Sequence, residues 1–415
     1  MSYNNFQKHF KKGHEEMGNH TLLKQINKLL VLKTILDNKT ISRAKISKLV
    51  DLNKATVSNL TDELIKEGFV IEKGYGHSKG GRRPVLLEVN KNVGLIIGID
   101  LGVNYIHLIL TNFIGEIVWE KSANIRLGET QERILEVLFE LIGEAIKVAP
   151  QTQKGILGIG IGVPGIVEKT SGIVLIAPNL RWKDVPLKAM VEERFNLPVY
   201  IDNEANAGAL GEKWFGNWGD VSHLVYVSVG IGIGAGIVIG DEIYRGAKGF
   251  AGEVGHTTID FNDDVCSCGN VGCLENFASE RALLSLIQKI VESGWEDEYI
   301  NKKNVDKLDA SYIIDSAKLG SKVALHAIKD IANKLGIGIA NLVNIFNPDI
   351  VIIGNKASFM GDLFLEELRR IVFKRSFITQ YHHVRVEISK LKDRACVLGC
   401  VAMVISDMLA FPDYV

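Results

Sequence analysis

The chain has 415 residues, 47% of them hydrophobic, and a net charge of −1. This length exceeds one ordinary domain and is enough for two or three domains with their own cores. The absence of any run of about 18 apolar residues argues against a membrane-spanning helix. Residues 1–19 lack the apolar core of a secretion signal, so we expect a cytoplasmic protein. Five cysteines do not make a disulfide framework in a chain of this size.

Charge is unevenly distributed along the chain. Residues 1–92 contain 17 Lys and Arg against 9 Asp and Glu, so the remaining residues carry a net negative charge. A basic amino-terminal module attached to an acidic body predicts a nucleic-acid partner for the first part only.

The first ninety residues have the pattern of a winged helix-turn-helix. Apolar positions at helical spacing predict a helix over 22–37, and Ser42 and Asn53 are suitable amino-terminal caps for two further helices, 42–49 and 54–67. Two short strands, 69–73 and 85–89, complete a hairpin with a glycine-rich tip. We therefore predict a DNA-binding domain over residues 1–92.

The third helix of this domain is the predicted recognition helix. Small polar residues at its start would let the backbone approach base edges, while longer side chains reach phosphates. Two arginines at the tip of the wing suit a narrow minor groove. The predicted DNA-binding residues are Lys54, Ala55, Thr56, Ser58, Asn59, Arg82 and Arg83. The alternative is a protein-interaction module with a basic, solvated loop.

Residues 93–415 predict an α/β body. Buried strands such as 94–102 and 156–163 alternate with helices such as 130–148 and 322–346. An Asp-Leu-Gly turn early in the body and glycine-rich turns later suggest two similar lobes with a ligand cleft between them.

A metal-ligand pattern lies within this body. Cys266, Cys268 and Cys273 follow His256, and thiolates with an imidazole complete a tetrahedral Zn²⁺ site. Four protein ligands leave no open position, so the zinc is predicted to be structural. The alternative is reduced surface cysteines near a chance histidine. Cys396 and Cys400 lie in an apolar helical stretch and are predicted to be buried thiols.

Several motifs resemble the ROK family, which groups repressors, open reading frames and sugar kinases. They are Glu253-Val-Gly-His256, the Cys266–Glu275 segment, Asn203-Glu-Ala-Asn-Ala207 and Asn347-Pro-Asp-Ile-Val-Ile-Ile-Gly354, which occur in family order. The resemblance covers Gly94 to the end. Together with the head, it implies a ROK transcriptional repressor whose body has the two-lobed fold of sugar kinases of the actin and hexokinase type.

The resemblance also implies which residues hold a sugar. Carboxylates and amides bind adjacent sugar hydroxyls in pairs, because each hydroxyl both donates and accepts. The expected sugar-binding residues are Asn179, Asn203, Glu204, Glu253, His256 and Glu275. His256 is expected to use one ring nitrogen for the sugar and the other for zinc. The favoured inducer is xylose, although glucose offers the same hydroxyls apart from one hydroxymethyl group.

Three departures from the family's kinases argue against phosphoryl transfer. Glu204 stands where the kinases have the Asp that serves as general base, and a displacement on the order of 1 Å can cost about a hundredfold in rate. The first phosphate loop, beginning at Asp100, lacks the second glycine and the hydroxyl of the kinase motif. Ile231 replaces a threonine in the second loop.

We therefore expect a switch without catalysis. A homodimer would bind a palindromic operator, and sugar would stabilise a closed body that misplaces the paired heads. Two alternatives are an ATP-dependent ROK sugar kinase with an accessory DNA head, and a constitutive DNA-binding protein whose body only dimerises or receives a protein partner.

Overall fold

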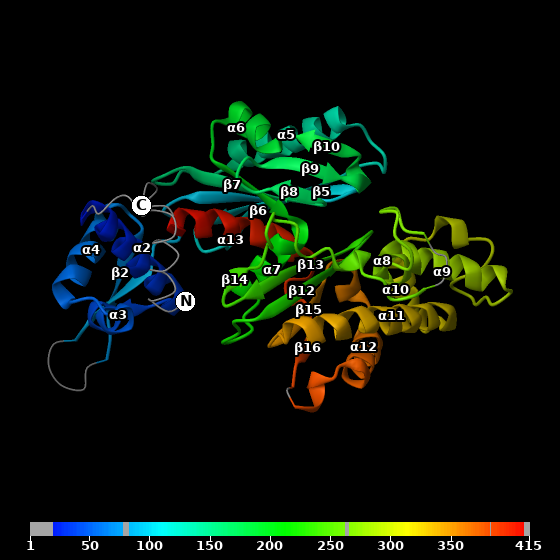
Figure 1. The fold of residues 1–415 in the computed structure, drawn as a ribbon. Coiled ribbons are helices and arrows are strands. Elements are labelled where there is room, and N and C mark those ends of the chain that lie inside the picture. Colours follow the sequence, from blue (N-terminus) through cyan, green and yellow to red (C-terminus); the bar gives the residue numbers. More distant parts are fainter. Residues whose placement is uncertain (1–19, 78–82, 262–264, 382, 411–415) are drawn as a thin grey trace.

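The computed structural model describes residues 20–77, 83–261, 265–381 and 383–410. They form a small amino-terminal head and a larger body of two lobes, and the C-terminal helix α13 runs from the head into the body (Figure 1). Within these ranges no helix combines the length and the apolar character needed to cross a bilayer. The predicted winged head and two-lobed α/β body are both present.

The head is a winged helix-turn-helix with a three-stranded sheet of order β1-β3-β2. Its elements are α2 (His20–Asn38), β1 (Ile41–Ser42), α3 (Arg43–Val50), α4 (Lys54–Lys66), β2 (Val70–Tyr75) and β3 (Val85–Val89). Both predicted caps are confirmed: Ser42 accepts a hydrogen bond from the Lys45 amide at 3.4 Å, and Asn53 accepts one from the Thr56 amide at 2.8 Å. These caps satisfy amide groups that the first turn of each helix leaves unpaired.

The first lobe is built on a five-stranded sheet of order β11-β7-β4-β5-β6. Its strands are β4 (Leu95–Leu101), β5 (Tyr105–Asn112), β6 (Ile117–Asn124), β7 (Ile156–Val163) and β11 (Val199–Asn203). Helices α5 (Gln131–Val148) and α6 (Leu187–Phe195) and a second sheet of β8 (Ile166–Glu168), β9 (Ile173–Ala177) and β10 (Trp182–Val185) complete it. Every residue of β4 is buried, as expected for a central strand covered on both faces.

The second lobe repeats this topology in the order β14-β13-β12-β15-β16. Its strands are β12 (Leu224–Val229), β13 (Ile233–Ile239), β14 (Glu242–Ile243), β15 (Ile350–Gly354) and β16 (Arg385–Ile388). Its helices are α8 (Leu274–Ala278), α9 (Glu280–Glu292), α10 (Ala310–Lys318), α11 (Lys322–Phe346) and α12 (Asp362–Arg375). In both lobes the central strand is antiparallel to the next strand and parallel to a later one. This repetition confirms the prediction of two similar lobes.

Two helices join the lobes, α7 (Glu204–Phe215) and α13 (Ala395–Ala410). Helix α7 packs on β12 and β13, whereas α13 packs on β4 and β7. Their backbones cross at contact distance, because a Cβ added at Gly399 would lie 1.6 Å from the carbonyl oxygen of Ala207. Only glycine permits so close a crossing. Cys396 and Cys400 of α13 are buried, as predicted.

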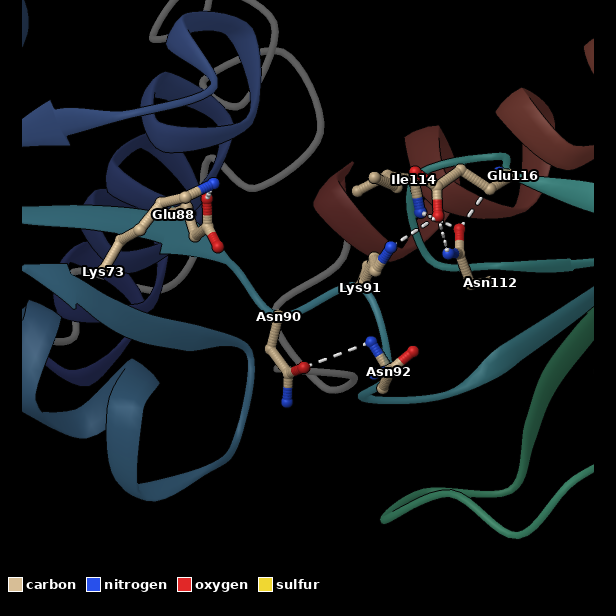
Figure 2. A network of polar contacts seen from close by, with 8 residues as sticks. All are labelled: Lys73, Glu88, Asn90, Lys91, Asn92, Asn112, Ile114 and Glu116. Carbon is tan, nitrogen blue, oxygen red and sulfur yellow. Dashed lines mark hydrogen bonds and ion pairs between the residues drawn. The ribbon is translucent and has the colours of Figure 1, made fainter.

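The head is attached to the body by an apolar core and a polar joint. The rings of Phe69 in the head and Phe113 in the first lobe meet edge to face at 5.7 Å. Beside them, the Lys91 ammonium lies 2.9 Å from the Glu116 carboxylate, which also accepts a hydrogen bond from the Asn112 side chain (Figure 2). The predicted domain boundary between residues 92 and 93 falls in this joint, between β3 and β4.

Candidate functional site

A cleft lies where the two lobes face each other. All six predicted sugar-binding residues line it, although they come from four separate segments of the chain: Asn179, Asn203, Glu204, Glu253, His256 and Glu275. The fold brings them together because the turn after β9, the carboxyl end of β11, the segment after β14 and the start of α8 all meet at the gap between the lobes. The result is a polar cleft rich in carboxylates.

Asn203 forms hydrogen bonds with two backbone segments at the base of the cleft. Its Oδ1 accepts hydrogen bonds from the amides of Ala205 at 2.8 Å and Asn206 at 3.4 Å, which caps α7. Its Nδ2 donates to the Gly165 carbonyl at 2.9 Å. An amide nitrogen carries two hydrogens, so one donor remains for a ligand.

Glu204 is the first residue of α7, and its Oε2 is enclosed without a hydrogen-bond partner among the described residues. Burial, together with the nearby charges of Asp100, Glu253 and Glu275, raises the pKa of this carboxyl from 4.5 to about 8. Removing a carboxylate from water disfavours its charged form, and like charges add to that effect. Glu204 is therefore mainly protonated at neutral pH and is able to donate a hydrogen bond.

Glu275 and Glu253 supply carboxylates from the second lobe. Glu275 accepts a hydrogen bond from the Ile233 amide at 2.9 Å. The accepting atom is Glu275 Oε2, and a Cβ at Gly232 would lie 2.5 Å from it. Glycine at position 232 therefore allows the Glu275 carboxylate to lie against the glycine-rich loop before β13. Glu253 lies at the exposed rim, where partial desolvation raises its pKa and the neighbouring His256 opposes that rise.

Asn179 enters from the first lobe, in the short turn Pro178–Leu180 after β9. Its Oδ1 accepts a hydrogen bond from the Arg281 guanidinium at 2.5 Å. Arg281 belongs to α9 in the second lobe, so this bond spans the two sides of the cleft. Reading the sequence did not identify Arg281, because nothing in its local pattern distinguishes it from a solvated helix residue.

Tyr105 is a second residue that the sequence reading missed. Its hydroxyl donates to Asp100 at 2.9 Å, and burial raises the pKa of Asp100. A Cβ at Gly102 would lie 2.4 Å from the Tyr105 ring. The ring therefore packs against Gly102 in the turn that corresponds to the first phosphate loop of the family's kinases. An aromatic residue three positions after the turn glycine was the available signal.

The four predicted metal ligands form one cluster. The ligand atoms of His256, Cys266, Cys268 and Cys273 all lie within 4.8 Å of one another. The sulfurs of Cys268 and Cys273 are 3.8 Å apart, and the sulfur of Cys266 lies 3.6 Å from His256 Nδ1. A tetrahedral ion with ligands at about 2.3 Å needs edges of about 3.8 Å. The cluster can therefore hold a metal ion, and Nδ1 is the ring nitrogen that faces it.

Five of the predicted DNA-binding residues lie on α4, and Arg83 lies just before β3 in the wing. Lys54, Ala55 and Asn59 are exposed and Thr56 and Ser58 are partly exposed, whereas Val57 and Leu60 face the core. Arg83 is exposed, and Arg82 lies outside the described residues. The third helix therefore presents the predicted small polar surface to solvent.

The head and the cleft together define a DNA-binding protein with a small-molecule site in a sugar-kinase-type body. Comparison with known proteins agrees: the winged helix-turn-helix DNA-binding pattern matches residues 25–71, and the ROK family pattern matches residues 96–407. The chain belongs to the ROK family.

Three similar proteins show how far the likeness extends. The xylose repressor of Caldicellulosiruptor bescii is 72% identical over 398 residues, which cover 96% of this chain and all of that protein. A crystal structure of a ROK family transcriptional regulator, a homolog of the E. coli MLC protein, has a TM-score of 0.80 at 28% identity and covers 94% of this chain and 98% of its own. A ROK family glucokinase from Streptomyces griseus, solved with glucose and AMPPNP, has a TM-score of 0.68 at 30% identity, covering 75% of this chain and 99% of its own.

Proposed function

We propose that this protein is a sugar-responsive transcriptional repressor, which binds operator DNA through its head and is released when sugar enters the cleft. The observation that carries the proposal is the combination of a winged DNA-binding head and a polar cleft in one continuous structure. The glucokinase matches three quarters of this chain and the regulator matches nearly all of it. The additional part is the head.

Xylose is the proposed inducer. The name of the Caldicellulosiruptor bescii relative, at 72% identity over its full length, supports this sugar. The chemistry of the cleft is suitable, because Glu253 and Glu275 offer acceptors while Asn179, Asn203 and protonated Glu204 offer donors. Sugar hydroxyls need both kinds of partner.

The same features argue against a kinase. A general base must be able to take a proton at the working pH. At neutral pH only a minor fraction of Glu204 is free to take one, since its pKa is raised to about 8. The Tyr105 ring packs against Gly102 in the loop after Asp100, which therefore differs from the open glycine loop that cradles phosphate. These residues support ligand binding without phosphoryl transfer.

The metal in the His and Cys cluster is proposed to be zinc with a structural role. Three thiolates and one imidazole are the ligands that structural zinc prefers. With Nδ1 of His256 on the metal, Nε2 carries the ring hydrogen and is left for the cleft. Zinc would thereby hold His256 and the segment leading to Glu275 in place.

The DNA-binding residues remain those predicted from the sequence. Lys54, Thr56 and Arg83 are proposed to contact phosphates or the minor groove, and Ala55, Ser58 and Asn59 to face base edges. A homodimer on a palindromic operator is the proposed assembly, because paired heads bind successive major grooves.

Helix α7 is the proposed route from the sugar to the head. It begins in the cleft at Glu204 and ends about 18 Å further on. At that end, the ring of Phe215 packs against Gly115 in the turn that also holds Glu116, the partner of Lys91. The Trp214 ring lies 5.8 Å from the Lys33 ammonium of α2. A shift of α7 would therefore move the joint and the head together.

Operator binding with and without sugar tests the proposal. Fluorescence anisotropy on DNA from the promoter region next to the gene, at one stated salt concentration, should show specific binding that weakens with xylose and not with glucose. Glu253→Gln should raise the xylose concentration needed by about five- to tenfold. Glu292→Gln, an exposed change at the end of α9, is the matched control.

Two outcomes would contradict the proposal. Specific DNA binding that ignores every sugar would return the body to a role in dimerisation or partner binding. Phosphorylation of a sugar in a coupled ATP assay would restore the kinase alternative. Release by a sugar other than xylose would keep the switch and replace the inducer.

A further inference from the structure

The bond between Asn179 and Arg281 determines which way the Asn179 amide faces. The Arg281 guanidinium can only donate hydrogen bonds, so the atom it meets at 2.5 Å must be the carbonyl oxygen of the amide. The amide nitrogen is then turned to the opposite side. A Cβ built at Gly232 would lie 3.9 Å from this nitrogen and 2.5 Å from Glu275 Oε2, so the nitrogen faces the cleft beside that carboxylate.

Both partners of this bond are held by rigid elements. Asn179 lies in a turn next to Leu180 and Trp182, which are buried in the core of the first lobe. Arg281 is the second residue of α9, whose first amide, that of Glu280, donates to the Gly230 carbonyl at 2.8 Å. The backbone of Arg281 is therefore anchored beside the same glycine loop that positions Glu275.

We propose that Arg281 is a positioning residue for the sugar, which holds Asn179 as a hydrogen-bond donor and links the two lobes across the mouth of the cleft. The inference rests on the proposed function, because it concerns the same sugar site. Nothing in the local sequence pattern or in the family resemblance used above assigns a role to Arg281.

The chemical consequence is a hydrogen-bond donor with a fixed orientation at one side of the cleft. Ionised carboxylates accept hydrogen bonds only, so a sugar oxygen near Glu275 needs a donor from another residue. Asn179 supplies it as long as its amide stays in this orientation. Without Arg281 the amide is free to rotate and present its oxygen, which would oppose the lone pairs of the sugar oxygen. Affinity would fall even though Arg281 makes no contact with the sugar.

Xylose binding to the full-length protein, measured by isothermal titration calorimetry, tests this role. The variants are Arg281→Met, Asn179→Ala, the double variant Arg281→Met/Asn179→Ala, and Arg281→Lys, which retains a donor. Lys289→Met, an exposed change further along α9, is the matched control. Thermal unfolding without sugar establishes that each variant is folded.

Arg281→Met is expected to weaken xylose binding about three- to tenfold, which corresponds to the loss of one partly exposed charge-assisted hydrogen bond. Arg281→Lys should recover part of the loss, and Lys289→Met should bind as the unchanged protein does. In the Asn179→Ala background, Arg281→Met should have less than a twofold effect, because the amide that it positions is gone.

The inference is overturned if Arg281→Met binds xylose within twofold of the unchanged protein, or if its effect persists in full without Asn179. In either case the proposed function still stands, provided that the unchanged protein binds xylose and releases DNA. If the unchanged protein binds neither xylose nor glucose, the proposed function fails and the role of Arg281 fails with it.

Discussion

Replacing Glu204 by Gln should make the stability of the protein less dependent on pH. In the folded protein this carboxyl keeps its proton up to a pH of about 8, whereas in the unfolded chain it loses the proton near 4.5. Between these values the unfolded chain binds fewer protons, so the free energy of unfolding falls as pH rises. The contribution of Glu204 to the free energy of unfolding is fully present below the unfolded-state pKa of 4.5. It is lost above the folded-state pKa of about 8.

The size of the effect follows from the two pKa values. The difference between 4.5 and about 8 corresponds to on the order of 5 kcal/mol, at about 1.36 kcal/mol per pKa unit. Gln cannot ionise and has nearly the same shape, so the variant lacks this loss. The quantity to compare is the unfolding free energy of Glu204→Gln minus that of the unchanged protein. We expect this difference to be about 3–5 kcal/mol larger at pH 9 than at pH 5.

Urea denaturation of both proteins at half-unit steps from pH 5 to 9 measures this difference. Other groups that change protonation between pH 5 and 9 are present in both proteins, so their contributions cancel in the comparison. Glu136→Gln, which removes a carboxylate exposed on α5, is the control for the loss of any single charge. Xylose binding at pH 7 should change by less than about threefold, since the amide also donates and accepts.

Parallel pH profiles for the unchanged protein and Glu204→Gln would refute the reasoning. They would mean that Glu204 is ionised in the folded protein at neutral pH. The carboxylate could then serve as a general base, and the argument against a kinase would rest on the two changed phosphate loops, at Asp100 and at Ile231.

Three further changes test other parts of the structure. Gly399→Ala should lower the unfolding free energy, measured in urea, by about 1–3 kcal/mol, because its Cβ would collide with the backbone of α7. Gly143→Ala in α5 is the control: open space surrounds this glycine, so the change should raise the unfolding free energy by about 0.5–1 kcal/mol. Phe113→Leu should loosen the contact with Phe69 and reduce the xylose effect on operator affinity about two- to tenfold, and an unchanged effect in anisotropy would exclude this contact from the coupling. Cys268→Ser should lower the zinc content by mass spectrometry from about one per chain to well below it, and a full zinc equivalent in the folded variant would refute the assignment.

Short-range patterns account for what the sequence predicts well. The caps Ser42 and Asn53 and the apolar face of α4 depend on residues three or four positions apart, and all are confirmed. The spacing of Cys266, Cys268 and Cys273 depends on a single loop, so the ligand cluster was also predictable. The sequence reading missed the helices α6, α7 and α12 and the small sheet β8-β9-β10, whose strands have only three to five residues.

The sequence by itself determined the head, the repeated α/β body, the residues of the cleft and the ligand cluster, because their signals are local or lie in recognisable motifs. Only the tertiary structure decided the protonation of Glu204 and the bond from Arg281 to Asn179. A pKa depends on burial and on charges from distant segments, and the last bond joins residues 102 positions apart. Such properties arise only when the two lobes face each other.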